Sequence, residues 1–238
     1  MILNFEELDY QQTPLGELIL QKRSAIEADG RLIFEVKLNQ EYLMTSLFYE
    51  GEIALARLGL DPLKGEDGDI VIGGLGLGFT AVEALKKQWV ERMIVVEALA
   101  PVIEWHKKGL VPNGEILNDD PRCIYHHADF FALARTSGFD PVRTNHQFNA
   151  ILLDIDHSPD ALLNPSHADF YTEAGIKRLS TFIKPGGVFA LWSNTPPDNE
   201  FMRLLSTAFS DVEGHTVEFP NPIQQNTASN GIYVAVKN

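Results

Sequence analysis

The feature that most constrains the fold is an alternation, from residue 67 onward, of short apolar runs with helical segments. The runs cover residues 70–72, 93–96, 150–153 and 188–192. Runs that are apolar on both faces predict strands buried on both sides, and helices between them predict parallel crossovers. The sequence therefore predicts an α/β fold with a doubly wound, mostly parallel, Rossmann-like sheet.

The two ends of the chain predict additional β-structure. Near the N-terminus, the pattern predicts strands at residues 16–20 and 31–36, separated by the turn signal Asp29-Gly30. Near the C-terminus, it predicts a closing hairpin of residues 212–217 and 232–236 across a loop with Pro220 and Pro222. Apolar spacing between residues 46 and 58 predicts a helix capped by Ser46. We expect residues 1–66 to form an N-terminal β-hairpin segment plus linking helix, and residues 67–238 the α/β domain.

Composition excludes several classes of partner. The 238 residues include 33 acids and 19 bases, a net charge of −14 that repels phosphate backbones, so we expect no nucleic-acid partner. No apolar run approaches the ~18 residues of a membrane span, and we expect no membrane partner. A single cysteine allows no internal disulfide, and residues 1–7 do not read as a secretory signal. These features favour a cytoplasmic protein.

A glycine-rich loop follows the first buried run. It reads Gly73-Gly74-Leu75-Gly76-Leu77-Gly78 and opens a helix near Phe79, where free N–H groups can meet a ligand. Phe79 stands where the dinucleotide pattern G-x-G-x-x-G requires its last glycine, which disfavours a classical NAD site. A tight strand-to-helix turn is the alternative to a ligand site.

Acidic residues follow the next strands at the same predicted edge. Glu97 lies 21 residues beyond Gly76, where a carboxylate can accept both ribose hydroxyls of an adenosine, although it can equally be a solvated surface residue. Asp129 is placed to accept from an adenine amino group, to cap the following helix, or both. Asp154 follows the strand at residues 150–153.

These residues together resemble a known family. The chain resembles the spermidine synthases, which have the class I S-adenosylmethionine-dependent methyltransferase fold. The segments that carry the resemblance are residues 70–78, Val95-Val96-Glu97, Asp120-Pro121-Arg122, Ala128-Asp129 and residues 148–154, 170–171 and 179–187. The resemblance covers most of the chain. It implies an adenosyl-sulfonium donor bound by the glycine loop, with Glu97 on the ribose, Asp129 on the adenine and Asp154 on the reacting amine.

Three departures from the family pattern bear on the reaction. Gly76 replaces the aspartate of the family's G-G-G-D-G-G loop, which helps to hold the aminopropyl ammonium. His157 replaces the second acid of D-S-x-D-P, and Phe48-Tyr49-Glu50 only partly matches Tyr-His-Glu. We therefore favour methyl transfer from S-adenosylmethionine to a small, possibly amine, acceptor. The alternatives are a polyamine aminopropyltransferase using decarboxylated S-adenosylmethionine and a non-catalytic binding module.

The expected acceptor site lies beside Asp154, which would orient or deprotonate the acceptor. His157 is a candidate base, or a polar loop residue. Tyr49, Asp156 and Trp192 are the candidate substrate-binding residues, and the loop after Trp192 can instead plug the end of the sheet. A buried cavity between Tyr49, Asp154 and Trp192 would favour an enzyme, and a filled one a scaffold.

We expect no metal, because the sequence lacks a cysteine–histidine cluster and the adjacent His126 and His127 would point to opposite faces of a strand. A small N-terminal sheet has open edges and little core of its own, which predicts a homodimer formed through it.

Overall fold

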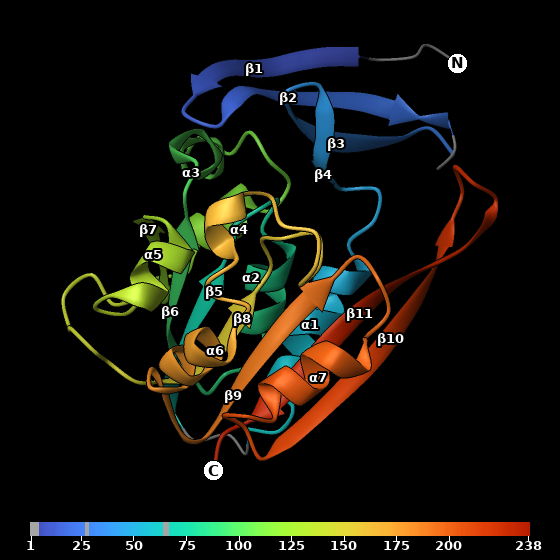
Figure 1. The fold of residues 1–238 in the computed structure, drawn as a ribbon. Coiled ribbons are helices and arrows are strands. Elements are labelled where there is room, and N and C mark those ends of the chain that lie inside the picture. The colour runs from blue at the N-terminus through green and yellow to red at the C-terminus, as the bar shows by residue number, and fades with distance from the viewer. Residues whose placement is uncertain (1–4, 27–28, 64–66) are drawn as a thin grey trace.

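The computed structural model describes residues 5–26, 29–63 and 67–238, which form two sheets (Figure 1). The predicted division of the chain between residues 66 and 67 adjoins residues 64–66, which lie outside the described residues, and it stays a prediction. The predicted fold class is confirmed: a seven-stranded, mostly parallel sheet is accompanied by a small antiparallel one.

The smaller sheet is an antiparallel meander in the order β1-β2-β3-β4. Its strands are β1 (Phe5–Thr13), β2 (Gly16–Ala25), β3 (Arg31–Leu38) and β4 (Glu41–Thr45). Leu18, Leu20 and Val36 are completely buried and belong to the same apolar cluster as the large sheet. The small sheet is thus fixed to the main body by shared core residues as well as by the chain.

The large sheet has the order β10-β11-β9-β8-β5-β6-β7. Its strands are β5 (Gly68–Gly73), β6 (Val90–Glu97), β7 (Cys123–His127), β8 (Phe148–Leu153), β9 (Ile183–Ser193), β10 (Asp211–Asn221) and β11 (Asn226–Val236). Strands β7, β6, β5, β8 and β9 are parallel, and β11 and β10 add an antiparallel hairpin. The strand order reverses between β5 and β8, which is where such sheets bind ligands.

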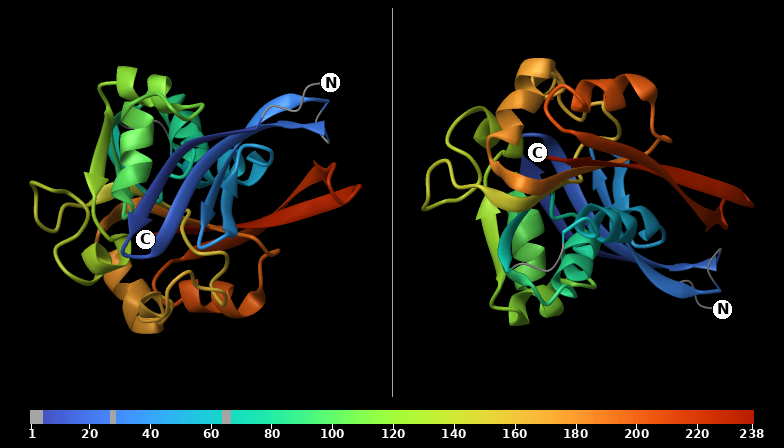
Figure 2. Two further views of the ribbon diagram at one scale, coloured as in Figure 1. Left: turned by 90° about the horizontal axis from the view of Figure 1, so that it is seen from above. Right: turned by 90° about the horizontal axis from the view of Figure 1, so that it is seen from below.

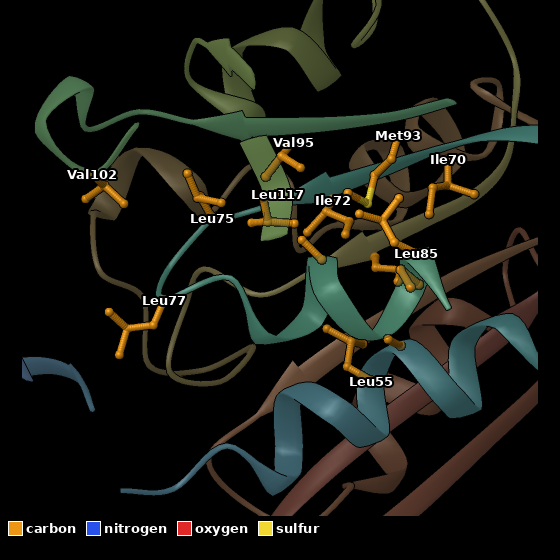
Figure 3. Packing of buried hydrophobic residues seen from close by; sticks show 14 of the residues in the cluster. Leu55, Ile70, Ile72, Leu75, Leu77, Leu85, Met93, Val95, Val102 and Leu117 are labelled. Carbon is orange, nitrogen blue, oxygen red and sulfur yellow. The ribbon is translucent and has the colours of Figure 1, made fainter. Parts of the chain in front are cut away.

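Helices cover both faces of the large sheet (Figures 1 and 2). They are α1 (Glu50–Leu60), α2 (Phe79–Leu85), α3 (Ala100–Lys107), α4 (Gly114–Asp119), α5 (Phe130–Arg135), α6 (Glu173–Ser180) and α7 (Asn199–Leu205). Ile70 and Ile72 pack toward α1–α4, as Figure 3 shows, while Val71 packs toward α5–α7. Alternate residues of one strand therefore serve two separate cores.

Two local expectations are wrong. Ser46 does not cap a helix: its Oγ accepts from the Phe34 N–H at 2.8 Å, and α1 begins at Glu50 with Tyr49 before it. The loop predicted across Pro220 and Pro222 is shorter than expected: the turn covers residues 222–225, and Pro220 lies in β10 at the edge of the sheet, where proline's missing N–H interrupts no central ladder.

The strands β1 and β4 each leave one edge unpaired within the described ranges, and Phe5, Tyr10 and Tyr42 are exposed on this sheet. Self-association through the sheet stays a prediction. Among the described residues, no helix is both long and apolar enough to cross a bilayer.

Candidate active site

A cavity of about 960 Å³ lies between the small sheet and the carboxyl ends of the large sheet's parallel strands. Its lower wall consists of the loops after β5, β6, β7 and β8, and its upper wall comes from the turns of the small sheet and from β4. The cavity therefore covers the reversal point between β5 and β8. Its position agrees with the general rule for open α/β sheets.

The glycine loop forms the floor of this cavity. Gly74 has a φ of +94°, and a Cβ there would lie 2.1 Å from the carbonyl oxygen of Asp154, so only glycine fits. The His106 ring contacts the Gly76 carbonyl through Nε2 at 3.0 Å, and Asn113 Nδ2 donates to the Leu77 carbonyl at 2.9 Å. These contacts fix the loop in one shape, and Gly74, Gly76 and Gly78 all line the cavity, whereas Gly73 packs beneath it against the Phe130 ring.

Glu97 lines the cavity at the end of β6, and its side chain is buried. Its Oε2 accepts from the Leu75 N–H at 3.0 Å and its Oε1 from the Leu99 N–H at 2.7 Å. Burial raises the pKa of Glu97, and these backbone donors oppose the rise. The backbone N–H groups of Ala98 and Gly76 also lie against this carboxylate, so Glu97 anchors the glycine loop at the position expected for the ribose.

Asp129 precedes α5 and serves as its N-cap. Its Oδ1 accepts from the N–H groups of Phe131 at 2.8 Å and Ala132 at 3.1 Å. Asp129 also lines the cavity, and its Oδ2 has no hydrogen-bond partner among the described residues. The cap is thus observed, and the second oxygen is available for an adenine amino group.

Asp154 faces a second carboxylate, Glu52, across the cavity. Asp154 Oδ2 accepts from Thr80 Oγ1 at 3.0 Å, and burial raises the pKa of Asp154 to about 6. Burial first, and then the charges of Asp154 and Glu50, raise the pKa of Glu52 to about 8. Two desolvated carboxyl groups that interact electrostatically in this way retain one proton between them near neutral pH.

Trp192 and His157 lie where the sequence predicts them, on the cavity wall. The indole N–H of Trp192 is buried and has no hydrogen-bond partner in the described part of the chain. It packs against Gly51, where a Cβ would lie 2.4 Å from Nε1. His157 is exposed, and its carbonyl accepts from the Asn194 N–H at 2.6 Å.

Two predicted acceptor residues do not reach the cavity. Tyr49 stacks on Phe79 with ring centroids 4.7 Å apart and is absent from the cavity wall. Asp156 is buried behind the wall, where it accepts from Tyr171 Oη, His167 Nδ1 and the Leu163 N–H. Tyr49 thus packs on a residue of the cavity wall, and Asp156 organises the loop after β8; their assignment to substrate stays a prediction.

No three potential metal ligands gather within residues 5–26, 29–63 and 67–238. His126 Nδ1 contacts the Phe139 carbonyl and His127 Nε2 the Ala98 carbonyl, on different sides of β7.

Glu52, Thr80 and His167 were not identified from the sequence, although all three line the cavity. Acids in the first turn of a helix are ordinary complements of the helix dipole, so nothing in the sequence distinguishes Glu52 from Glu50. Thr80 and His167 belong to no motif, and only the packing of loops distant in sequence brings them to the cavity.

The charge of the cavity is one-sided. Five carboxyl groups line it, and no lysine or arginine does so among the described residues. The five are Glu41, Glu52, Glu97, Asp129 and Asp154. A largely apolar enclosure strengthens the field of such a set, so the cavity favours cationic ligands.

Glu97→Ala is expected to weaken binding of adenosyl thioethers by about 1.5–3 kcal/mol, the range for hydrogen bonds to a charged group. The loss has two sources, the ribose hydroxyls and the N–H groups of Leu75 and Leu99 that lose their acceptor. Calorimetry with 5′-methylthioadenosine measures it, and Glu97→Gln, which retains one acceptor oxygen, is the matched control. Equal affinity in wild type and Glu97→Ala would contradict the assignment.

Comparison with known proteins agrees with this geometry. No family model matches the sequence, and no curated protein matches it. Among solved structures, a spermidine synthase in complex with the transition-state analogue AdoDATO is 20% identical with a TM-score of 0.72, covering 98% of this chain and 74% of the other. The spermidine synthase of Thermotoga maritima is 18% identical with a TM-score of 0.71, covering 100% of this chain and 80% of the other. The predicted resemblance is thus confirmed in the fold, which extends over nearly the whole chain.

Proposed function

We propose that this protein is an aminopropyltransferase, which transfers the aminopropyl group of decarboxylated S-adenosylmethionine to an amine. The observation that carries the proposal is the cavity wall of five carboxyl groups, with no lysine or arginine among its described residues. The decarboxylated donor bears a sulfonium and an ammonium, and the acceptor amine arrives as an ammonium. All three cationic groups suit such a wall.

This proposal reverses the expectation of methyl transfer. That expectation was based on three departures from the family pattern, above all on Gly76, where a loop carboxylate is missing. S-adenosylmethionine carries a carboxylate of its own, which would enter a cavity with five acids and meet no cationic side chain on its described wall. The likeness to spermidine synthases, one of them holding AdoDATO, also supports the aminopropyl alternative.

The chain's own residues supply orientation, charge and a proton acceptor. The glycine loop, Glu97 and Asp129 would hold the adenosyl group, leaving the sulfonium near Asp154. Asp154, ionised while Glu52 holds the shared proton, would attract the acceptor ammonium and would take or relay its proton. The amine nitrogen then bonds to the aminopropyl carbon while the carbon–sulfur bond breaks, its electron pair stays on sulfur, and 5′-methylthioadenosine leaves.

Two rival functions remain distinguishable. Methyl transfer requires preference for S-adenosylmethionine, and a non-catalytic binding module requires an acceptor site that has closed. The open cavity between Asp154 and Trp192 favours an enzyme over a binding module.

Competitive calorimetry with the two donors tests the proposal. We expect the decarboxylated donor to bind at least about tenfold more tightly, a difference of ~1.4 kcal/mol. Incubation with linear diamines should then release 5′-methylthioadenosine and an aminopropylated amine, detected by mass spectrometry. Preference for S-adenosylmethionine would establish methyl transfer instead, and binding without product from any amine would favour the binding module.

Gly76→Asp sharpens this test, because it restores the acid that the family carries. A Cβ at Gly76 would find only Met44 Sδ, 3.8 Å away, and aspartate tolerates the φ of +52° better than most residues. The variant should increase preference for the decarboxylated donor further. Gly76→Asn is the matched control, with the same shape and no charge.

A further inference from the structure

We propose that His167 determines the specificity of the donor site for a 6-aminopurine, by accepting a hydrogen bond from the exocyclic amino group of adenine beside Asp129. The inference rests on the proposed adenosyl donor and goes beyond it, because it assigns a role to a residue outside every motif described above.

The tautomer of His167 is set by Asp156. The Asp156 side chain is buried, with 3% of the residue exposed, and accepts from the Leu163 N–H at 2.8 Å and from Tyr171 Oη at 2.9 Å. His167 Nδ1 lies 2.8 Å from Asp156 Oδ1. A carboxylate is an acceptor, so Nδ1 carries the hydrogen, and in the neutral ring Nε2 is left with a free lone pair.

The ring of His167 is held beside Asp129. It stacks on the Phe131 ring with centroids 3.8 Å apart and an interplanar angle of 21°. Phe131 in turn donates its backbone N–H to Asp129 Oδ1 at 2.8 Å. His167, Phe131 and Asp129 all line the cavity, and only 12% of the His167 side chain is exposed. His167 and Asp129 therefore both contact Phe131, one through its ring and one through its backbone N–H, and each has a further acceptor atom in a residue of the cavity wall.

Two hydrogen-bond acceptors can bind an amino group and would repel a carbonyl oxygen. The exocyclic amino group of adenine has two N–H bonds, one for each acceptor. A 6-oxopurine would present an oxygen to the same two atoms, leaving lone pairs facing one another without a hydrogen. Sites that hydrogen-bond a polar ligand group reject analogues that cannot make the bond. We expect the wild-type protein to bind 5′-methylthioadenosine at least about tenfold more tightly than 5′-methylthioinosine.

His167→Asn and His167→Gln test the roles of the two ring nitrogens, Nδ1 and Nε2, separately. The asparagine amide can donate to Asp156 in place of Nδ1 but has no atom at the position of Nε2. The glutamine amide reaches the position of Nε2 with an oxygen acceptor. His167→Phe retains the stack on Phe131 without either nitrogen, and it provides a second removal variant if His167→Asn does not fold.

Calorimetry gives the ratio of the two dissociation constants for each variant, and thermal melting shows that each is folded. The inference predicts that in His167→Asn and His167→Phe the ratio falls to the smaller preference that Asp129 alone supplies, and that it recovers toward the wild-type ratio in His167→Gln. If His167 had a purely structural role, its removal would weaken the binding of both nucleosides equally and leave the ratio of dissociation constants unchanged, and this result would overturn the inference. A wild-type ratio near one would also overturn it. Failure of both nucleosides to bind wild type would overturn the proposed function itself.

Discussion

Asp154→Asn is expected to lower the rate of aminopropyl transfer by about 10²–10⁴-fold, the usual contribution of a positioned acid–base group. Asp154 follows the buried strand β8, and its only hydrogen-bond donor in the described part of the chain is Thr80 Oγ1, at 3.0 Å. Its pKa of about 6 leaves it ionised near neutral pH yet basic enough to receive a proton from an acceptor ammonium. Asparagine preserves the shape and the Thr80 contact but removes both charge and basicity.

Single-turnover measurements with bound donor isolate this step, since they exclude product release. Affinity for the uncharged 5′-methylthioadenosine should stay near its wild-type value, whereas the melting temperature near neutral pH should rise, because asparagine places no charge in this buried position. Thr80→Val is the matched control: it removes the donor to Asp154 while retaining the carboxylate, and should cost much less in rate. Wild-type turnover in Asp154→Asn would remove Asp154 from the mechanism.

Glu52→Gln is expected to make the protein more stable at high pH and to leave its stability nearly unchanged at low pH. Burial and the charge of Asp154 raise the pKa of Glu52 from 4.5 to about 8. The folded state therefore retains a proton that the unfolded chain releases, and wild-type stability falls as pH rises from the unfolded value through the folded one. Glutamine stays neutral throughout and does not incur this loss.

Melting curves between about pH 4 and pH 9 measure the effect. Near pH 4, below the unfolded pKa of 4.5, the two proteins should melt together, and near pH 9 the variant should melt at least ~2–4 °C higher, which corresponds to about 1 kcal/mol in a chain of this size. Glu50→Gln, in the same helical turn, is the matched control and should show a smaller pH-dependent difference. A difference between Glu52→Gln and wild type that does not change with pH would show that Glu52 ionises as an ordinary surface carboxylate.

The large sheet and the position of the glycine loop and acidic residues at its edge could be predicted because both depend on local sequence. Strand β5 and the glycine loop are contiguous, and Glu97, Asp129 and Asp154 each stand directly after a buried run of the chain. Parallel strands bring these positions to one edge whatever the detailed packing, so pattern alone places them together. Asp156 shows the limit of this reasoning, since it is two residues beyond Asp154 yet turns into the core.

The α/β fold, the antiparallel additions at both ends and the residues at the carboxyl edge of the parallel strands all follow from local patterns, because strand and turn patterns are fixed by local backbone and burial preferences. The charge and shape of the cavity do not: the interaction of Glu52 with Asp154, the set of five acids without a lysine or arginine on the described wall, and the contact of His167 with Phe131 depend on tertiary packing. The electrostatics of the cavity instead depend on side chains from distant segments, which meet only when the small sheet, α1 and the loop after β8 pack over the same edge.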